Sequence, residues 1–271
     1  MTQPTARQPA IFVSHGGGPC FWITMPPPFT PTSFDGLADY LASIPGSLPE
    51  RPRAILVISG HWETRVPTVS TSPRPPMYFD YYGFPEHTYR LNYPAPGSPV
   101  LAGRVRELLA AAGVASAEDP ARGFDHGVFV PFLKIYPEAE IPVVALSLQQ
   151  DFDPAEHIAI GVALAPLRDE GVLIVGSGMS YHNLRSFGDG DGATSEGFDA
   201  WLSATATHPE PEVRNRRLGE WDSAPYARAA HPREDHLLPL MVVAGAAGND
   251  IGRHAFSERI GGKHVSGFEF G

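Results

Sequence analysis

The hydrophobic positions of the chain gather in four short, nearly continuous runs that are bounded by turn residues. Runs of this length, rich in β-branched residues or leucine, are typical of strands that are buried on both faces of a sheet. The predicted strands are Ala10–Ser14, Ala54–Ser59, Ile141–Leu148 and Val172–Gly176.

Helical patterns separate and follow these strands. The predicted helices cover residues 99–112, 154–170 and 237–246. Ser98 is a suitable N-cap for the first helix, and Gly113 is a suitable stop. Asp153 and Pro154 together are a typical opening for the second. Strands that alternate with helices predict an α/β fold, with a single domain over residues 1–271 and a central mixed or mostly parallel sheet flanked by helices.

Composition narrows the class of protein. The chain of 271 residues has 42% apolar and 18% charged residues, which is typical of a globular protein. A net charge of −10 without a basic segment argues against nucleic acid or an anionic membrane as partner. The sequence has no signal-peptide or membrane-spanning run, and its lone cysteine excludes an internal disulfide. We therefore expect a cytoplasmic protein, either a monomer or a homodimer.

Proline and glycine are abundant, with 29 and 28 residues, which indicates shaped loops around the regular elements. The stretch from Val66 to Pro99 is rich in proline and aromatic residues and shows no clear period. We expect it to form a structured loop over the functional site rather than a linker.

Three of the eleven histidines follow the ends of predicted strands. His15 follows the first strand in SHGGGP, His61 follows the second in SGHWE, and His182 lies beyond a glycine turn after the fourth. Ligands of α/β sheets bind beyond the carboxyl ends of the strands, so these three imidazoles are expected to face one crevice. A single histidine is more often satisfied by a backbone hydrogen bond, but three at one edge favour a divalent first-row metal.

Two other segments offer candidates for the same crevice. His126 lies in a glycine-flanked turn, GFDHGVFVP, and the segment HPREDHLLPL contains both His231 and His236, of which we expect one to point inward. The remaining histidines are expected to be surface or packing residues: His157 in a helix, and His87, His208, His254 and His264 in loops. The short zinc motifs, the P-loop and the G-x-S-x-G motif are absent from the sequence.

Six motifs occur in the order of a known family: SHGGGP (14–19), SGHWE (59–63), YPAPGSP (93–99), GFDHGVFVP (123–131), GSGMSYHNLR (176–185) and EDHLLPL (234–240). As a set, they make the chain resemble the class III extradiol ring-cleavage dioxygenases, in particular the 4,5-DOPA dioxygenase branch. The resemblance covers most of the chain, from the first predicted strand into the last predicted helix.

The resemblance implies a non-haem Fe(II) enzyme that opens the ring of a catecholic substrate, DOPA-like or related, with O2. His15, His61 and His236 match the family's metal ligands. His182 matches a histidine that is a further ligand in metal-bound members of this branch and an acid/base residue in the wider class. His126 matches a catalytic histidine on the substrate side of the site. Iron is expected for activity, and zinc is an expected occupant of the purified protein.

Several alternatives stay open at this level. Asp235 stands where many relatives carry glutamate, so either Glu234 or Asp235 completes the metal site or one of them only orients His236. The same scaffold also fits a zinc-binding Memo-like protein or a metal-dependent hydrolase, in which zinc activates water. These rivals predict no oxygen uptake in the presence of catechols.

The sequence also leaves the substrate side of the site undecided. Trp62, Phe129 and the aromatic loop 78–84 either wall a flat aromatic substrate or belong to the core. A carboxylate on the substrate would need a cation at the pocket. The candidates for this cation are Lys134, Arg185 and Arg233.

Overall fold

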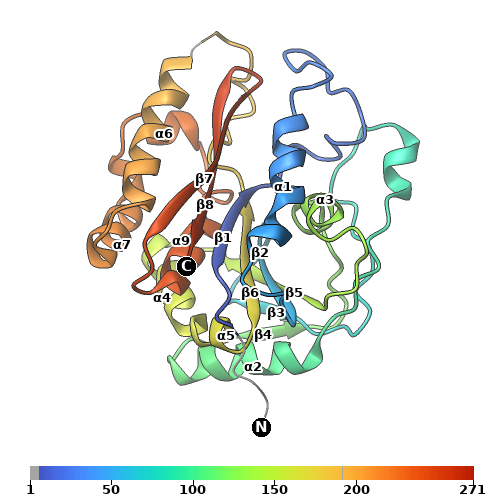
Figure 1. The fold of residues 1–271 in the computed structure, drawn as a ribbon, viewed down its shortest axis with the longest axis vertical. Helices are drawn as coiled ribbons and strands as arrows, with labels where there is room; N and C mark the ends of the chain where they lie inside the picture. The colour runs from blue at the N-terminus through green and yellow to red at the C-terminus, as the bar shows by residue number, and fades with distance from the viewer. Residues whose placement is uncertain (1–5, 191) are drawn as a thin grey trace.

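A computed structural model describes residues 6–190 and 192–271, and within them eight strands form one mixed sheet in the order β4-β3-β5-β2-β6-β1-β8-β7 (Figure 1). The four central strands, β5, β2, β6 and β1, run parallel, whereas β3 and β8 run antiparallel to the central strands beside them. The strands are β1 (Ala10–Ser14), β2 (Ala54–Thr64), β3 (Thr68–Ser70), β4 (Ala117–Asp119), β5 (Val143–Gln149), β6 (Val172–Gly178), β7 (Gly252–Ile260) and β8 (Lys263–Phe270).

Helices cover both faces of the sheet, with α1 and α3 on one face and α4 and α9 on the other (Figure 1). Successive side chains of β1 enter two separate cores, since Ala10 and Phe12 pack on one face and Ile11 and Val13 on the other. The helices are α1 (Asp35–Ser47), η1 (Glu86–Arg90), α2 (Pro99–Ala111), α3 (His126–Ile135), α4 (Pro154–Leu164), α5 (Pro166–Asp169), α6 (Gly192–Ala206), α7 (Pro211–Gly219), η2 (Trp221–Ser223), α8 (Ala227–Ala230) and α9 (Leu238–Ala247).

The predicted α/β class and the mostly parallel flanked sheet are confirmed, and all four predicted strands are present. Four further strands were missed. The hairpin β7–β8 escaped prediction because β7 carries exposed charged residues between its apolar ones and lies at the sheet edge. His254 and His264, expected in loops, lie in these two strands.

A proline explains where one predicted helix needed correction. The helix expected over residues 154–170 is two helices, because Pro166 has no backbone N–H to continue the ladder and begins α5 instead. Ser98 and Asp153 cap α2 and α4 as predicted, through their side-chain oxygens. His126, expected in a turn, begins α3 and is buried.

The second strand also differs from its prediction in a way that matters for the site. It continues past Ser59 to Thr64, so His61 lies inside β2 rather than after it. Its register with β5 shifts between Ile58 and Glu63: five residue steps on β2 face two steps on β5, from Leu146 to Leu148. Such an irregularity bends a strand and redirects its side chains. Among the described residues, no helix has the length and apolar character that a membrane crossing requires.

Candidate active site

Five histidines from five separate segments line one pocket of about 450 Å³ at the carboxyl ends of the parallel strands. His15 follows β1, His61 lies in the irregular part of β2, and His182 follows β6. His126 begins α3 and His236 precedes α9. The structure thus brings together every histidine that the sequence proposed for the crevice, and of the pair His231 and His236 it is His236 that faces the pocket.

Three of these rings direct the same nitrogen atom at one another. The Nε2 atom of His61 lies 3.2 Å from Nε2 of His15 and 3.1 Å from Nε2 of His236. The Nδ1 atom of His15 donates to the Gly16 carbonyl oxygen at 2.8 Å, and Nδ1 of His236 donates to the Asp235 carboxylate at 2.8 Å. A neutral ring that carries its proton on Nδ1 has a lone pair on Nε2. His15 and His236 therefore both present lone pairs to His61.

Electrostatics keep these rings neutral. The pKa values of His15, His61 and His236 are held well below the ordinary value, first because burial penalises the charged imidazolium and then because the other histidines repel a further proton. Neutral, buried imidazoles with converging lone pairs are the donor set that divalent first-row metals bind. The residues present therefore fit a metal ion. A single proton on His61 Nε2 could satisfy only one of the two facing lone pairs.

The register shift in β2 and two glycines allow these segments to approach. A side chain at Gly178 would lie 2.1 Å from the carbonyl oxygen of His236, so only glycine lets the end of β6 pass beside that residue. The carbonyl oxygen of His236 in turn accepts a hydrogen bond from the Met179 N–H at 3.0 Å. Gly60 similarly faces the backbone of Asp235 and His236, which brings β2 against the same segment.

Asp80 is a site residue that the sequence reasoning missed. Both of its carboxylate oxygens lie 2.8 Å from Nδ1 of His126, and Oδ1 also accepts the His126 backbone N–H at 2.9 Å. Its Oδ2 lies 3.5 Å from Nδ1 of His61. The carboxylate fixes the Nδ1–H tautomer of His126 and leaves Nε2 as the nitrogen available to the pocket. The available signal was an acidic residue in an otherwise aromatic loop, YFDYYGF.

His126 and His182 stand at different sides of the three converging rings. The ring centroid of His126 is 3.9 Å from that of His61, and suitable donor atoms of His15, His61 and His126 lie within 4.8 Å of one another. The ring of His182 instead stacks on His236, with centroids 3.4 Å apart, and it groups with Asp235 and His236. These two sets share no residue, and the Nε2 contacts link one set to the other, because His61 lies directly against both His15 and His236. We take these direct contacts to define the centre of the site.

Asp235 orients His236 instead of reaching the converging nitrogens. Its Oδ2 accepts the proton on Nδ1 of His236, whereas its Oδ1 has no hydrogen-bond partner among the described residues. Glu234 turns away, and pairs with Arg228 at 2.7 Å. Of the two carboxylates left open by the sequence, Asp235 is therefore the one in contact with the histidine cluster.

The remaining described histidines lie outside the pocket. His157 is buried in α4, where its Nδ1 atom donates to the Asp153 carbonyl and its Nε2 atom accepts from the Gln149 N–H, as expected of a packing residue. His231 is fully buried between Phe198 and Trp221, and its Nε2 atom donates to the Ser180 carbonyl. Burial lowers the pKa of His231 to about 4. Both are structural residues.

The aromatic residues divide between core and pocket. Tyr81 and Phe84, from the loop predicted to cover the site, line the pocket, whereas Trp62 and Phe129 are buried elsewhere and belong to the core. None of the cationic residues proposed from the sequence lines the histidine pocket. Lys134 lies over the rings of Phe21 and Trp22, and Arg233 pairs with Glu63. Arg185, too, is absent from the lining.

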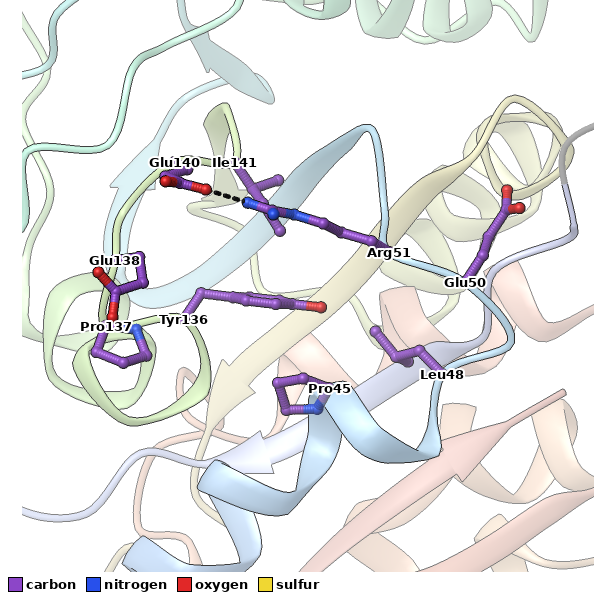
Figure 2. A pocket seen from close by; sticks show the side chains of 9 residues that line it. All are labelled: Pro45, Leu48, Glu50, Arg51, Tyr136, Pro137, Glu138, Glu140 and Ile141. Atoms are coloured by element: carbon purple, nitrogen blue, oxygen red, sulfur yellow. Dashed lines mark hydrogen bonds and ion pairs between the residues drawn. The ribbon is translucent and has the colours of Figure 1, made fainter.

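A second hollow, of about 300 Å³, lies near the amino ends of the parallel strands, and Figure 2 shows the side chains around it. Arg51 precedes β2 and Ile141 precedes β5, so this hollow is at the sheet edge opposite the histidines. Its main polar contact is an exposed ion pair between Arg51 and Glu140 at 2.7 Å. It contains no histidine and no convergent donor set.

Comparison with known proteins identifies a matching family, named relatives and a similar solved structure. Residues 9–268 match the model of the catalytic LigB subunit of aromatic ring-opening dioxygenase. A 4,5-DOPA dioxygenase extradiol of Beta vulgaris is 44% identical over 205 residues, which cover 74% of this chain and 75% of that protein. A protein with the same name from Escherichia coli (strain K12) is 38% identical over 248 residues, which cover 89% of this chain and 86% of that protein.

A solved structure has the same fold. The crystal structure of the uncharacterized protein JW3007 from Escherichia coli K12 superposes with a TM-score of 0.77 at 31% identity, and the match covers 98% of this chain and 100% of that one. The chain therefore belongs to the LigB family of aromatic ring-opening dioxygenases, and it is an extradiol ring-cleavage enzyme.

Proposed function

We propose that this enzyme is an Fe(II)-dependent extradiol dioxygenase that opens the ring of a catechol, DOPA-like or related, with O2. One observation carries the proposal: the Nε2 atoms of His15 and His236 both lie within 3.2 Å of the Nε2 atom of His61. The relatives named 4,5-DOPA dioxygenase extradiol support the reaction and the catecholic ring.

The proposed metal ligands are His15, His61 and His236, with His182 as a further ligand beside them. A ferrous ion held by these residues would supply open coordination positions through which catechol and O2 could exchange electrons. We expect iron in the active enzyme, and zinc in protein purified in air, because imidazole binds both metals. The hydrogen bonds from Nδ1 of His15 and His236 support this set, because they keep Nε2 free for a metal.

The proposed acid/base residues are His126 and His182. His126 lines the pocket with Nε2 as its available nitrogen, so this atom can accept a proton from a catechol hydroxyl and later return it. Asp80 stabilises the ring while it carries this second proton, because the carboxylate faces Nδ1. His182 lies on the other side of His236, where a neutral imidazole can serve the opposite end of the reacting ring.

We extend the proposal to the whole molecule. Residues 1–271 form one catalytic domain, because strands from residue 10 to residue 270 join a single sheet. The buried, unpaired Cys20 is compatible with the reducing cytoplasm. The enzyme works as a monomer or a homodimer, since the candidate site takes all of its histidines from one chain.

The decisive experiment is anaerobic reconstitution with Fe(II), followed by addition of a catechol and a measured amount of O2. The expected result is one O2 consumed per catechol, together with the appearance of a yellow ring-opened product. Zinc-loaded protein is the matched control and should consume no O2. Ester or amide hydrolysis by the zinc form, without oxygen uptake by the iron form, would contradict the proposal in favour of a metal-dependent hydrolase.

A further inference from the structure

We propose, on the basis of the function proposed above, that within the range of DOPA-like and related catechols this enzyme prefers those with an apolar substituent over those that carry a short charged side chain. The inference rests on the lining of the histidine pocket, in which charged side chains are absent among the described residues. The feature of the substrate concerned is the substituent on the catechol ring.

Outside the five histidines, the lining side chains are almost all apolar. They come from the loop after β1, the loop before η1, the segment after β6 and the end of β7. The residues are Met25, Pro27, Pro28, Phe29, Phe34, Tyr81, Phe84, Met179, Leu184, Phe187 and Ile260. Phe29 connects two of these segments, because its ring centroid lies 5.3 Å from that of Phe34 and 5.5 Å from that of Phe187.

The polar atoms of the lining carry no charge that could pair with an ionic substituent. The hydroxyl of Tyr81 donates to the Thr88 carbonyl oxygen at 2.7 Å and is therefore not directed at a ligand. Nε2 of His126 and the ring of His182 are open to the pocket, but in the proposed function they serve the hydroxyl groups of the catechol. Beyond the histidines, the backbone of the Gly16–Gly18 loop offers polar atoms to the pocket.

The position of the substituent follows from the position of the histidines. A catechol whose hydroxyls face the imidazoles must place its substituent among the other lining residues, because the imidazoles occupy the strand-end side. The pocket of about 450 Å³ is within the range that holds a drug-sized ligand, so it leaves room beyond a single ring.

Burial then separates substrates by charge. An alkyl or aryl substituent leaves water for an apolar surface, which favours binding. A carboxylate or ammonium group on a short tail would lose its hydration next to Phe29 or Phe187 without gaining an ionic partner, which is strongly unfavourable. The exposed Leu184 marks the mouth, so a charge is tolerated only on a tail long enough to reach solvent.

The experiment compares catechols of matched size on the iron-reconstituted enzyme: 4-propylcatechol, dihydrocaffeate (in which a carboxylate replaces the terminal methyl), dopamine and L-DOPA. We expect kcat/KM for 4-propylcatechol to exceed that for dihydrocaffeate and L-DOPA by a factor of about ten or more. The zinc-loaded enzyme, titrated calorimetrically without O2, should show the same order in Kd.

A lysine placed at the mouth of the pocket tests whether the substituent of the catechol lies there. Leu184→Lys should raise kcat/KM for dihydrocaffeate relative to 4-propylcatechol by roughly three- to tenfold. Val162→Lys is the control, because Val162 is also an exposed apolar residue but lies on α4 outside the pocket. It should leave the ratio unchanged.

The outcomes are distinguishable. Preference for dihydrocaffeate or L-DOPA over 4-propylcatechol would overturn this inference and point to the amides of the Gly16–Gly18 loop as a carboxylate site, while leaving the ring-cleavage proposal intact. Failure to cleave all four catechols would overturn the proposed function and this inference with it. An unchanged ratio in Leu184→Lys would contradict the placement of the substituent towards the mouth.

Discussion

The two hollows at opposite ends of the parallel strands differ in how their polar groups meet water. At the amino ends, Arg51 and Glu140 form an ion pair whose side chains are 62% and 64% exposed, so solvent already satisfies both charges (Figure 2). At the carboxyl ends, His15 and His236 are almost fully buried and face His61 with lone pairs that no proton arrangement can all satisfy. The site is therefore recognised by donors that lack partners and not by the presence of a hollow.

Removing a converging imidazole is the strongest test of this contrast. His61→Ala should lose most bound metal and all measurable ring cleavage, because rigid strand backbone cannot replace the missing donor, and His15→Ala and His236→Ala should behave alike. His126→Ala should keep near-normal metal but lose cleavage by roughly 10²–10⁴-fold, the usual range for an acid/base residue. His182→Ala should show partial metal loss with severe loss of turnover.

Metal content and oxygen uptake must be measured on the same samples, with circular dichroism as the check on folding. A His61→Ala protein that binds iron and cleaves catechol like the parent would remove the distinction between the two hollows, since His61 would then be a packing residue.

Asp80 tests whether orientation of the rings matters as well as their presence. Asp80→Asn keeps the size of the side chain but removes the charge that faces Nδ1 of His126, so kcat should fall by roughly 10- to 100-fold with a smaller change in KM. Nitrogen NMR should show that His126 loses its fixed Nδ1–H tautomer. The exposed Asp222, changed to Asn, serves as control. Unchanged kcat with an unchanged tautomer would show that Asp80 is only a loop anchor.

Burial of histidine also predicts how stability depends on pH. The pKa of His231 is about 4 in the folded protein, because the ring is buried, against about 6.5 in an unfolded chain. Between these values the unfolded chain binds more protons, so the contribution of His231 to stability is complete above about pH 6.5 and is lost as pH falls towards 4. At pH 5 the loss is about 2 kcal/mol.

Urea unfolding of the metal-free parent and of His231→Phe, at pH 7.5 and pH 5, measures the contribution of His231 to the free energy of unfolding. The parent should lose more stability on acidification than the variant does, and the difference isolates His231 from the other buried histidines. Equal losses in the two proteins would mean that His231 is not kept neutral by the fold.

The smallest effect is expected at the amino-end hollow. Arg51→Ala and Glu140→Gln should leave metal content, kcat and KM unchanged within error, because the pair is solvated and far from the histidines along the strands. A change in turnover in either variant would show that the second hollow affects the histidine site even though solvent satisfies its charges.

Much of this molecule could be predicted from local patterns. The four central strands, the caps at Ser98 and Asp153, and the set of histidines follow from side-chain periodicity and motif order, because burial on both faces forces continuous apolar runs and capping needs only a nearby side chain. The edge hairpin β7–β8 was missed, since an edge strand with one solvated face carries a weaker signal.

Other features depend on contacts between segments that are distant in the sequence. That His236 and not His231 enters the pocket follows from the approach of its backbone to Gly60 and Gly178, which spacing along one segment does not encode. The partnership of Asp80 with His126 joins residues 46 positions apart, and the redirection of His61 depends on a register shift between β2 and β5. Local residue patterns and motif order are enough to identify the imidazoles and the fold that carries them. Which nitrogen atoms meet depends on contacts between distant segments, because strand pairing and close backbone packing set that geometry.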